Sequence, residues 1–304
     1  MFKTPLFRLS SGLAVIMLLG SCTTVNLPSI TDSPTNIRLS GKIVWHDLIS
    51  DTPEASAAFY SELFGWEFES VGGAFGLGSN SAYSLIRHNG RLIGGMVDQN
   101  KLQSSEDISQ WMSLMSVDDM VVAIARVQAQ GGTLLTPPTE LADRGVLAVI
   151  SDPQGAYIAL VETRGGDPYD RVPQNGDFLW NELWSTNVEK ASRFYRKVGS
   201  YDKEIKVIDD DVTYHLLSDK GTPRVGLLTH PAPDIGDVWV NYIRVADPQA
   251  ILDRVEELGG EILVPLRQRD VGGQVALISG PSGAGIAIQT WDESMQSAIR
   301  EQLQ

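Results

Sequence analysis

One stretch of this chain occurs twice. The segment WHDLISDTPEASAAFY at 45–60 returns 135 positions later as WNELWSTNVEKASRFY at 180–195. Farther along the offset becomes 128, and residues 130–162 align with 258–290 through matching glycines and prolines. Repetition over this length indicates a duplicated structural unit. The chain therefore consists of two homologous halves, and the loop 164–177 separates them.

Each half divides again into two units, each with one strand, one helix and three more strands. Residues 43–50 alternate as a strand does, and a helix follows that Gly65 ends. We expect Ala55, Phe59 and Leu63 on the buried face of this helix because they are four residues apart. Three strands after one helix cannot form a doubly wound parallel sheet. The predicted fold class is therefore α+β, with four βαβββ modules and mixed sheets.

The N-terminal residues are typical of an export signal. Residues 1–21 combine two cations with a short apolar run and end in small residues, which predicts a signal peptide. Cys22 is the only cysteine, and the sequence LGSC that it closes resembles the lipobox of bacterial lipoproteins. The resemblance implies cleavage before Cys22, lipidation of that residue and a membrane anchor. Because Thr23 follows, it also implies the periplasmic face of the outer membrane in the cell envelope.

Composition narrows the remaining possibilities. Residues 22–38 are rich in Ser, Thr and Pro, which predicts a flexible tether after the lipidated cysteine. The formal net charge of −14 argues against nucleic acid as a partner. We expect folded domains at 39–164 and 175–292, followed by a C-terminal tail at 293–304. A monomer is expected, because the duplication already supplies both pairs of modules in one chain.

The modules, the helix that ends in Phe-Tyr and the closing segment DPQGAYIAL (152–160) resemble the vicinal oxygen chelate superfamily. That superfamily includes glyoxalases, extradiol dioxygenases, and fosfomycin and bleomycin resistance proteins. The resemblance covers about residues 41–291. It implies two tandem glyoxalase-like domains, in each of which two modules pair so that cupped sheets enclose a cavity. It leaves the activity open, since one scaffold serves several chemistries.

The metal-using members carry His, Gln or Glu at four positions of each cavity. By the resemblance, one of these positions falls within 91–97 or 224–229, which hold glycines but no carboxylate. The other positions fall on Trp45, Met112 and Ala159 in the first half, and on Trp180, Val240 and Ala287 in the second. A divalent ion needs several oxygen or nitrogen donors. We therefore expect no metal site of the family type and no cofactor.

Strand alternation predicts which side chains enter each cavity. His46 is turned to the opposite face as a packing residue, and Arg244 points inward, where it could neutralise Glu182. The tryptophans could serve as a platform for a ligand or could fill the cavities as plugs. The candidate ligand-binding residues are Trp45, Asp47 and Tyr157 in the first half, and Trp180, Glu182 and Tyr242 in the second.

Three functions are compatible with such cavities. The favoured one is metal-independent binding of a small apolar or cationic molecule by a lipoprotein of the envelope, which is similar to the bleomycin resistance branch. The second is a metal-independent enzyme of the lyase or isomerase type, in which Asp47 or Glu182 is the general acid or base. The third is an interaction protein whose cavities are filled by its own tryptophans.

Overall fold

The structure is a computed structural model that describes residues 27–71, 82–102, 106–209, 212–231, 235–269 and 273–291. The expected signal peptide, the lipidation site at Cys22 and the C-terminal tail lie outside these residues. Within the described parts, no helix has the length and apolar character needed to cross a bilayer.

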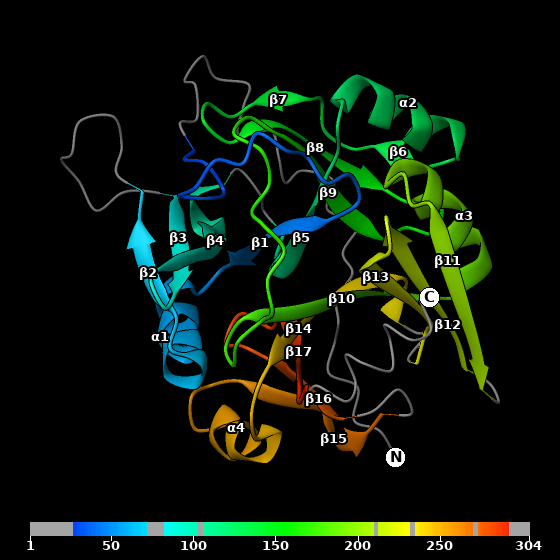
Figure 1. The fold of residues 1–304 in the computed structure, drawn as a ribbon. Coiled ribbons are helices and arrows are strands. Elements are labelled where there is room, and N and C mark those ends of the chain that lie inside the picture. Colours follow the sequence, from blue (N-terminus) through cyan, green and yellow to red (C-terminus); the bar gives the residue numbers. More distant parts are fainter. Residues whose placement is uncertain are drawn as a thin grey trace.

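The first half forms one mixed sheet, with strand order β2-β3-β4-β1-β5-β9-β8-β6 and the short β7 paired to β8 (Figure 1). Its helices are α1 (Pro53–Phe64) and α2 (Met120–Ala129), with a 3-10 turn η2 (Gln99–Lys101). Its strands are β1 (Ile43–Ser50), β2 (Glu67–Ser70), β3 (Tyr83–His88), β4 (Arg91–Asp98), β5 (Gln110–Ser116), β6 (Thr133–Leu134), β7 (Thr139–Glu140), β8 (Gly145–Ser151) and β9 (Tyr157–Thr163).

The second half repeats this arrangement, with strand order β11-β12-β13-β10-β14-β17-β16-β15. Its helices are α3 (Val188–Val198) and α4 (Pro248–Val255). Its strands are β10 (Phe178–Ser185), β11 (Lys203–Asp209), β12 (Val212–Asp219), β13 (Thr222–Thr229), β14 (Val238–Arg244), β15 (Glu261–Gln268), β16 (Gln274–Ser279) and β17 (Gly285–Gln289). In each half the first strand is parallel to the fourth and antiparallel to the first strand of the next module. The predicted α+β class with four βαβββ modules in two tandem domains is confirmed.

The two sheets pack back to back at their centres. Nε2 of His46 on β1 hydrogen-bonds the amide of Asn181 on β10 at 3.1 Å. Ser113 on β5 donates to Asn241 on β14 at 2.7 Å. Each pair joins equivalent positions of the two halves, 135 and 128 residues apart. The halves are therefore related by a pseudo-twofold axis that passes between their central strands.

The repeated Phe-Tyr pair and the repeated Gly-Gly pair contact each other across this axis. A Cβ atom built at Gly260 would lie 2.6 Å from the ring of Phe59, and one at Gly132 would lie 2.7 Å from the ring of Phe194. Each half thus places the phenyl ring of its first helix on the second glycine of the other half. Any larger residue at that glycine would collide with the ring. Helices α2 and α3 accordingly lie side by side (Figure 1).

The tyrosine next to each of these phenylalanines accepts a hydrogen bond from a tryptophan of its own half. The indole N–H of Trp111 donates to the hydroxyl of Tyr60 at 3.0 Å, and Trp239 donates to Tyr195 at 3.0 Å. Buried residues of both halves mix in the two cores that contain these rings. The aromatic repeat therefore forms the interface between the domains as well as the core of each.

The buried face of α1 differs by one position from the predicted one. Phe59 and Leu63 are buried as expected, but Ala55 is exposed and Ser56 is buried in its place. The hydroxyl of Ser56 hydrogen-bonds that of Ser50 on β1 at 2.9 Å. This polar contact brings the serine, rather than the more apolar alanine, onto the sheet.

His46 has the packing role that strand alternation predicted. Its side chain is buried and its ring stacks on Phe178 at a centroid distance of 3.7 Å. Burial lowers the pKa of His46 from 6.5 to about 4, because the charged form cannot be hydrated there, although the hydrogen bond to Asn181 opposes this shift. A histidine that stays neutral in the fold gains a proton more readily when the chain unfolds. Its contribution to stability is therefore present above pH 6.5 and decreases as the pH falls toward 4.

We predict that His46→Gln weakens the acid sensitivity of folding. Between pH 7 and pH 4.5 the wild type should lose about 2 to 3 kcal/mol more unfolding free energy than the variant, which has no imidazole to protonate. Urea unfolding of both proteins at the two pH values measures this difference. Equal losses for the two proteins would contradict the assignment.

Candidate functional site

Each sheet curls so that its outer strands meet over its centre. In the first sheet five strand-to-strand steps separate β3 from β8, which is roughly 24 Å in a flat sheet. Yet Arg144, just before β8, donates from Nη1 to the hydroxyl of Tyr83 on β3 at 2.8 Å. In the second sheet Arg269 directly follows β15 and Tyr214 lies on β12, six strand-to-strand steps away, yet both contact Glu182. Both sheets therefore have the cupped shape that the sequence predicted.

We call the cupped sides the first and second concave faces. Each carries an apolar cluster that is distinct from the two interdomain cores. The buried members of the first are Ile30, Val44, Trp45, Tyr83, Leu85, Met112, Leu114, Val149, Ala159 and Val161. Those of the second are Trp184, Val240, Tyr242, Val275, Leu277 and Ala287.

The first concave face holds a network of four polar side chains. The indole N–H of Trp45 donates to Oδ1 of Asp47 at 2.8 Å, and the hydroxyl of Tyr83 donates to the same oxygen at 2.6 Å. Arg144 stands over both rings, with its guanidinium carbon 4.8 Å from the centroid of Trp45 and 5.1 Å from that of Tyr83. Its Nη1 lies 3.9 Å from Oδ2 of Asp47. Trp45 and Arg144 are each 1% exposed, so both side chains are buried on this face.

The second concave face repeats the network around Glu182, which is 0% exposed. Tyr214 donates to Oε1 of Glu182 at 3.0 Å and receives the indole N–H of Trp180 at 3.0 Å. Tyr242 donates to Oε2 of Glu182. Arg269 donates from Nη2 to Oε1 at 2.7 Å, and its guanidinium lies 5.3 Å from the ring of Tyr242. The carboxylate thus accepts from three donors, one of which is the cation Arg269.

Burial and charge act together on the pKa values of these groups. Burial alone would lower the pKa of Arg269, but the Glu182 carboxylate beside it outweighs that effect and raises it. Burial raises the pKa of the phenols of Tyr83, Tyr214 and Tyr242 far above the usual range. The arginine therefore stays charged and the tyrosines stay protonated, so every group keeps the donor role that the network requires.

A glycine on the neighbouring strand leaves room for each tyrosine. Gly95 pairs with Asp47 and Gly226 pairs with Glu182 in the sheet registers. A Cβ atom at Gly95 would lie 1.8 Å from the hydroxyl oxygen of Tyr83, and one at Gly226 would lie 2.1 Å from that of Tyr214. The glycines that the sequence shows on these strands are therefore needed for the phenol to reach the carboxylate.

The structure brings the predicted residues to the predicted faces. Trp45 and Asp47 lie on the first concave face, where Tyr157 packs against the apolar cluster at its margin. Trp180, Glu182 and Tyr242 lie on the second.

Arg244 does not contact Glu182. Its Nη1 donates instead to the carbonyl of Pro173 at 2.6 Å, and Arg269 supplies the cation that the sequence assigned to Arg244.

Sequence reasoning missed Tyr83 and Tyr214 and the arginines of both networks, whereas it included Tyr242. Tyr83 and Tyr214 had a signal, because each stands twelve residues before the glycine that accommodates it. An alignment of the third and fourth strands of the first module would have paired them. Arg144 and Arg269 had no such signal, because they occupy different positions relative to the matched Gly145 and Gly273.

The residues of the first concave face do not fit a divalent metal. Gly95 stands on the strand where the fourth ligand would lie, and Trp45, Met112 and Ala159 take the other ligand positions, so a single thioether is the only donor among these side chains. The guanidinium of Arg144 lies where it would repel a divalent cation. Within the described residues, no three His, Cys, Asp or Glu side chains gather in a way that could hold a metal ion.

The two concave faces differ in what covers them. Residues 27–38 pack on the first domain, unlike the flexible tether that their composition predicted. Ile30 is 2% exposed within the first apolar cluster, and Asn36 donates its backbone N–H to Gly165 at 2.9 Å. On the second face Trp180 is only partly buried. Around it lie further partly buried apolar side chains, namely Leu179, Leu228, Val238, Leu263 and Val264.

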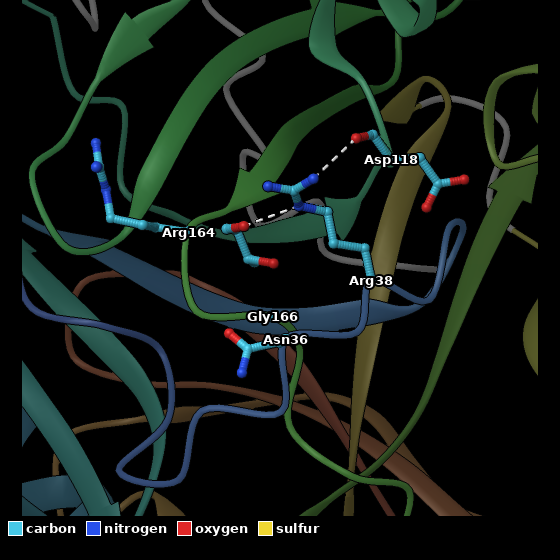
Figure 2. A pocket seen from close by; sticks show the side chains of 6 residues that line it. Asn36, Arg38, Asp118, Arg164 and Gly166 are labelled. Carbon is cyan, nitrogen blue, oxygen red and sulfur yellow. Dashed lines mark hydrogen bonds between the residues drawn. The ribbon is translucent and has the colours of Figure 1, made fainter.

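A polar hollow of about 300 Å³ lies outside the concave faces (Figure 2). Arg38 extends across it and donates to the carbonyls of Asp118 at 3.2 Å and Thr163 at 2.8 Å. Arg38 also pairs with Glu162 at 3.4 Å, and Arg164 pairs with Glu140. Both guanidinium groups already have partners within the protein. We therefore interpret the hollow as a gap between residues 36–38 and the first sheet, and not as a binding site.

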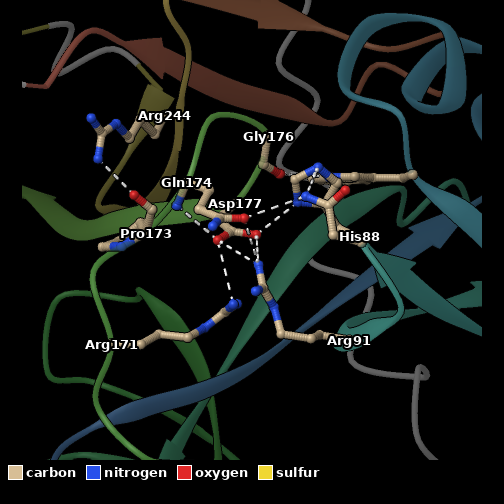
Figure 3. Close-up of polar contacts among 10 residues, drawn as sticks. His88, Arg91, Arg171, Pro173, Gln174, Gly176, Asp177 and Arg244 are labelled. Atoms are coloured by element: carbon tan, nitrogen blue, oxygen red, sulfur yellow. Dashed lines mark hydrogen bonds and ion pairs between the residues drawn. The ribbon is translucent and has the colours of Figure 1, made fainter.

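A second polar cluster ties the loop between the halves to the first domain (Figure 3). Asp177 is buried and accepts hydrogen bonds from Nδ1 of His88 at 2.7 Å and from Nη2 of Arg91 at 3.2 Å. Arg171 adds an ion pair at 3.5 Å. Burial would raise the pKa of Asp177, but hydrogen bonds from the backbone N–H of Gln174 and from His88, with the charges of Arg171 and Arg91, hold it below its usual range. The cluster fixes the course of the loop into β10.

Comparison with known proteins agrees with this architecture. A family model described as a glyoxalase-like domain matches residues 44–161. The chain is 26% identical over 242 residues to the "Putative glyoxylase CFP32" of Mycobacterium tuberculosis, an alignment that covers 79% of this chain and 91% of that protein. It is also 26% identical over 281 residues to the "Anthracycline biosynthesis protein DnrV" of Streptomyces peucetius, which covers 85% and 96%, respectively.

Solved structures share the fold at low identity. The Mn(II)-bound glyoxalase from Novosphingobium aromaticivorans has a TM-score of 0.54 and 14% identity, over 84% of this chain and 83% of that one. The 2,3-dioxygenase LapB from Pseudomonas sp. KL28 has a TM-score of 0.54 and 14% identity, over 84% and 93%. The vicinal oxygen chelate fold is therefore confirmed, and at this identity the likeness extends to the fold alone.

We predict that Glu182 and Arg269 of the second concave face are strongly coupled in their effects on the unfolding free energy. Arg269→Met leaves Glu182 charged and buried without its cation and should cost about 3 to 5 kcal/mol of unfolding free energy. The double variant Glu182→Leu/Arg269→Met should recover about 2 kcal/mol of that loss, since it removes both charges together.

Urea unfolding measures these differences, and the exposed pair of Arg254 and Glu62, 2.9 Å apart, is the control. Arg254→Met should cost less than about 1 kcal/mol, because water screens that pair. An Arg269→Met variant as stable as Arg254→Met would disprove the role given to the buried network.

Proposed function

We propose that this protein binds a small apolar molecule, without a metal, on the second concave face of its glyoxalase-like fold. We further propose that it does so as a lipoprotein that Cys22 anchors at the periplasmic face of the outer membrane. The observation that carries the binding proposal is the partly buried indole of Trp180 among partly buried aliphatic side chains. An exposed aromatic surface within a curved apolar sheet is what an apolar ligand requires.

The charges of this face favour an apolar ligand over a cationic one. Glu182 is the carboxylate that the sequence offered to a cation, but Arg269 already neutralises it at 2.7 Å. Tyr214 and Tyr242 take further lone pairs of the same carboxylate. A cationic ligand would have to displace Arg269 from a buried site, which is costly.

The same contacts favour binding over acid–base catalysis. A general acid or base has to exchange a proton with its substrate, and it needs an oxygen that can reach that substrate. Glu182 is 0% exposed and surrounded by donors. Asp47 receives Trp45 and Tyr83 on one oxygen, with Arg144 beside the other. These carboxylates hold their neighbours in position. This supports a function in ligand binding over one as a lyase or isomerase.

We predict that Trp180→Ala weakens the binding of a neutral apolar probe. N-phenyl-1-naphthylamine fluoresces more strongly in apolar surroundings, so a fluorescence titration reports its affinity directly. The loss of one aromatic contact surface should weaken binding by about tenfold.

Tyr169→Ala is the matched control, because Tyr169 is a 69% exposed aromatic residue on the loop between the halves. It should bind the probe as the wild type does. Equal affinities for Trp180→Ala and Tyr169→Ala would refute binding at the second face.

The anchor is tested separately. We expect cells that express the full chain to incorporate labelled palmitate into the wild type but not into Cys22→Ser, because that thiol is the only one in the chain. Label that persists in Cys22→Ser would rule out lipidation at this residue without affecting the binding proposal.

A further inference from the structure

The N-terminal segment 27–33 occupies the first concave face in the way that a ligand would. The side chain of Ile30 is buried in the apolar cluster with Trp45, and Leu27 packs against the same cluster. The backbone carbonyl of Pro28 accepts a hydrogen bond from Nε of Arg144 at 3.3 Å. The segment thus presents an aliphatic group to the apolar surface and a neutral carbonyl oxygen to the buried guanidinium.

This segment is held far more weakly than the one that follows it. Besides the hydrogen bond to the Pro28 carbonyl, an ion pair of Asp32 with Arg87 at 2.9 Å joins the segment to the sheet, and the side chain of Asp32 is 56% exposed. Exposed ion pairs of this kind contribute little to stability.

Residues 35–39, in contrast, are fastened to the loop after β9 by several hydrogen bonds. Asn36 donates to the Gly165 carbonyl at 2.9 Å, Ile37 accepts from the backbone N–H of Asp167 at 2.8 Å, and Leu39 donates to the Asp167 carboxylate at 2.6 Å. Residues 27–33 can therefore leave the concave face while residues 35–39 stay in place.

Arg144 has a donor that none of its neighbours satisfies. Its side chain is 0% exposed, and two of its nitrogens bond the Pro28 carbonyl and the Tyr83 hydroxyl. Its Nη2 is buried and has no partner among the described residues. A buried guanidinium nitrogen without an acceptor is costly, and it is where the oxygen of an incoming molecule would gain most.

We propose that the first concave face is a second binding site, for an apolar molecule that carries a neutral carbonyl oxygen, and that residues 27–33 occupy this site until the ligand displaces them. Arg144 binds the oxygen, and the surface that Ile30 now covers binds the apolar body. A neutral carbonyl fits better than a carboxylate, because Asp47 already supplies the negative charge that faces Arg144 at 3.9 Å. The site is separate from the one proposed for Trp180, so each stands without the other.

The test measures binding of Prodan, a neutral aromatic ketone whose fluorescence reports the polarity around it. The protein is the mature chain from residue 22 with Cys22→Ser, which keeps every described residue and avoids lipid that would take up the probe. All variants also carry Trp180→Ala, which weakens the second concave face equally in every protein compared. Ile30→Ser releases the segment, and Ile37→Ser is the matched control because Ile37 is 53% exposed and lies in residues 35–39, which stay in place.

We expect Ile30→Ser to bind Prodan about tenfold more tightly than its parent, while Ile37→Ser binds as the parent does. A synthetic peptide of residues 27–33 at millimolar concentration should compete with Prodan in the Ile30→Ser variant, because the tethered segment acts at a similar effective concentration. Equal Prodan affinities for the two isoleucine variants, or no competition by the peptide, would overturn the proposal.

A separate comparison tests whether the site prefers a molecule with a carbonyl oxygen. Arg144→Lys in the Ile30→Ser background keeps the charge but loses the paired donors, so Prodan should return to the parent affinity while N-phenyl-1-naphthylamine, which has no carbonyl, is unaffected. Thermal unfolding checks that this variant is folded. If Arg144→Lys is not folded, the affinities of the two probes for Ile30→Ser are compared with those for its parent. An equal gain in affinity for both probes would reject the role of Arg144.

Discussion

A carboxylate buried in the hollow of a curved sheet needs a cation, and the rest of each domain is arranged to supply one. Asp47 and Glu182 stand on the central strands, and Arg144 and Arg269 reach them from the far edge of each sheet. Tyr83 and Tyr214 reach the same carboxylates from the opposite side of each sheet. These contacts only form if the sheet is cupped, so the ion pair and the curvature depend on each other. On each concave face the positive charge beside the carboxylate is thus supplied by a side chain of the protein.

The two halves keep the same network but differ in access to it. The first half is preceded by residues 27–38, whose early part lies on the first concave face. The corresponding position before the second half is the loop 164–177, which the buried carboxylate of Asp177 ties to His88 and Arg91 instead. The second face therefore keeps Trp180 partly accessible, while the equivalent Trp45 is almost fully buried. Duplication has therefore given one chain two similar concave faces, of which the first is covered by residues 27–33 and the second is partly open at Trp180.

The sequence was informative wherever a property repeats with a fixed period. Strand alternation placed Trp45, Asp47, Trp180 and Glu182 on the concave faces and turned His46 away from them. The duplicated pattern and the order of strands and helices were enough to predict the fold class.

What could not be predicted depends on contacts between residues far apart in sequence. Arg144 is ninety-seven residues from Asp47, and Arg269 is not at the matching position of the repeat, so neither spacing nor alignment joins them to a carboxylate. The Ser, Thr and Pro content of residues 27–38 is that of a linker, but the buried Ile30 and the hydrogen bonds of residues 35–39 hold them against the first domain.

The reciprocal contact of Phe59 with Gly260 and of Phe194 with Gly132 also bears on the history of the chain. Each half carries both a phenyl ring and a glycine on which the phenyl ring of the other half packs. An ancestral half-length chain with these features would be complementary to a second copy of itself. Gene fusion would then have joined two subunits of a symmetric dimer, after which the faces pointing away from the axis were free to diverge.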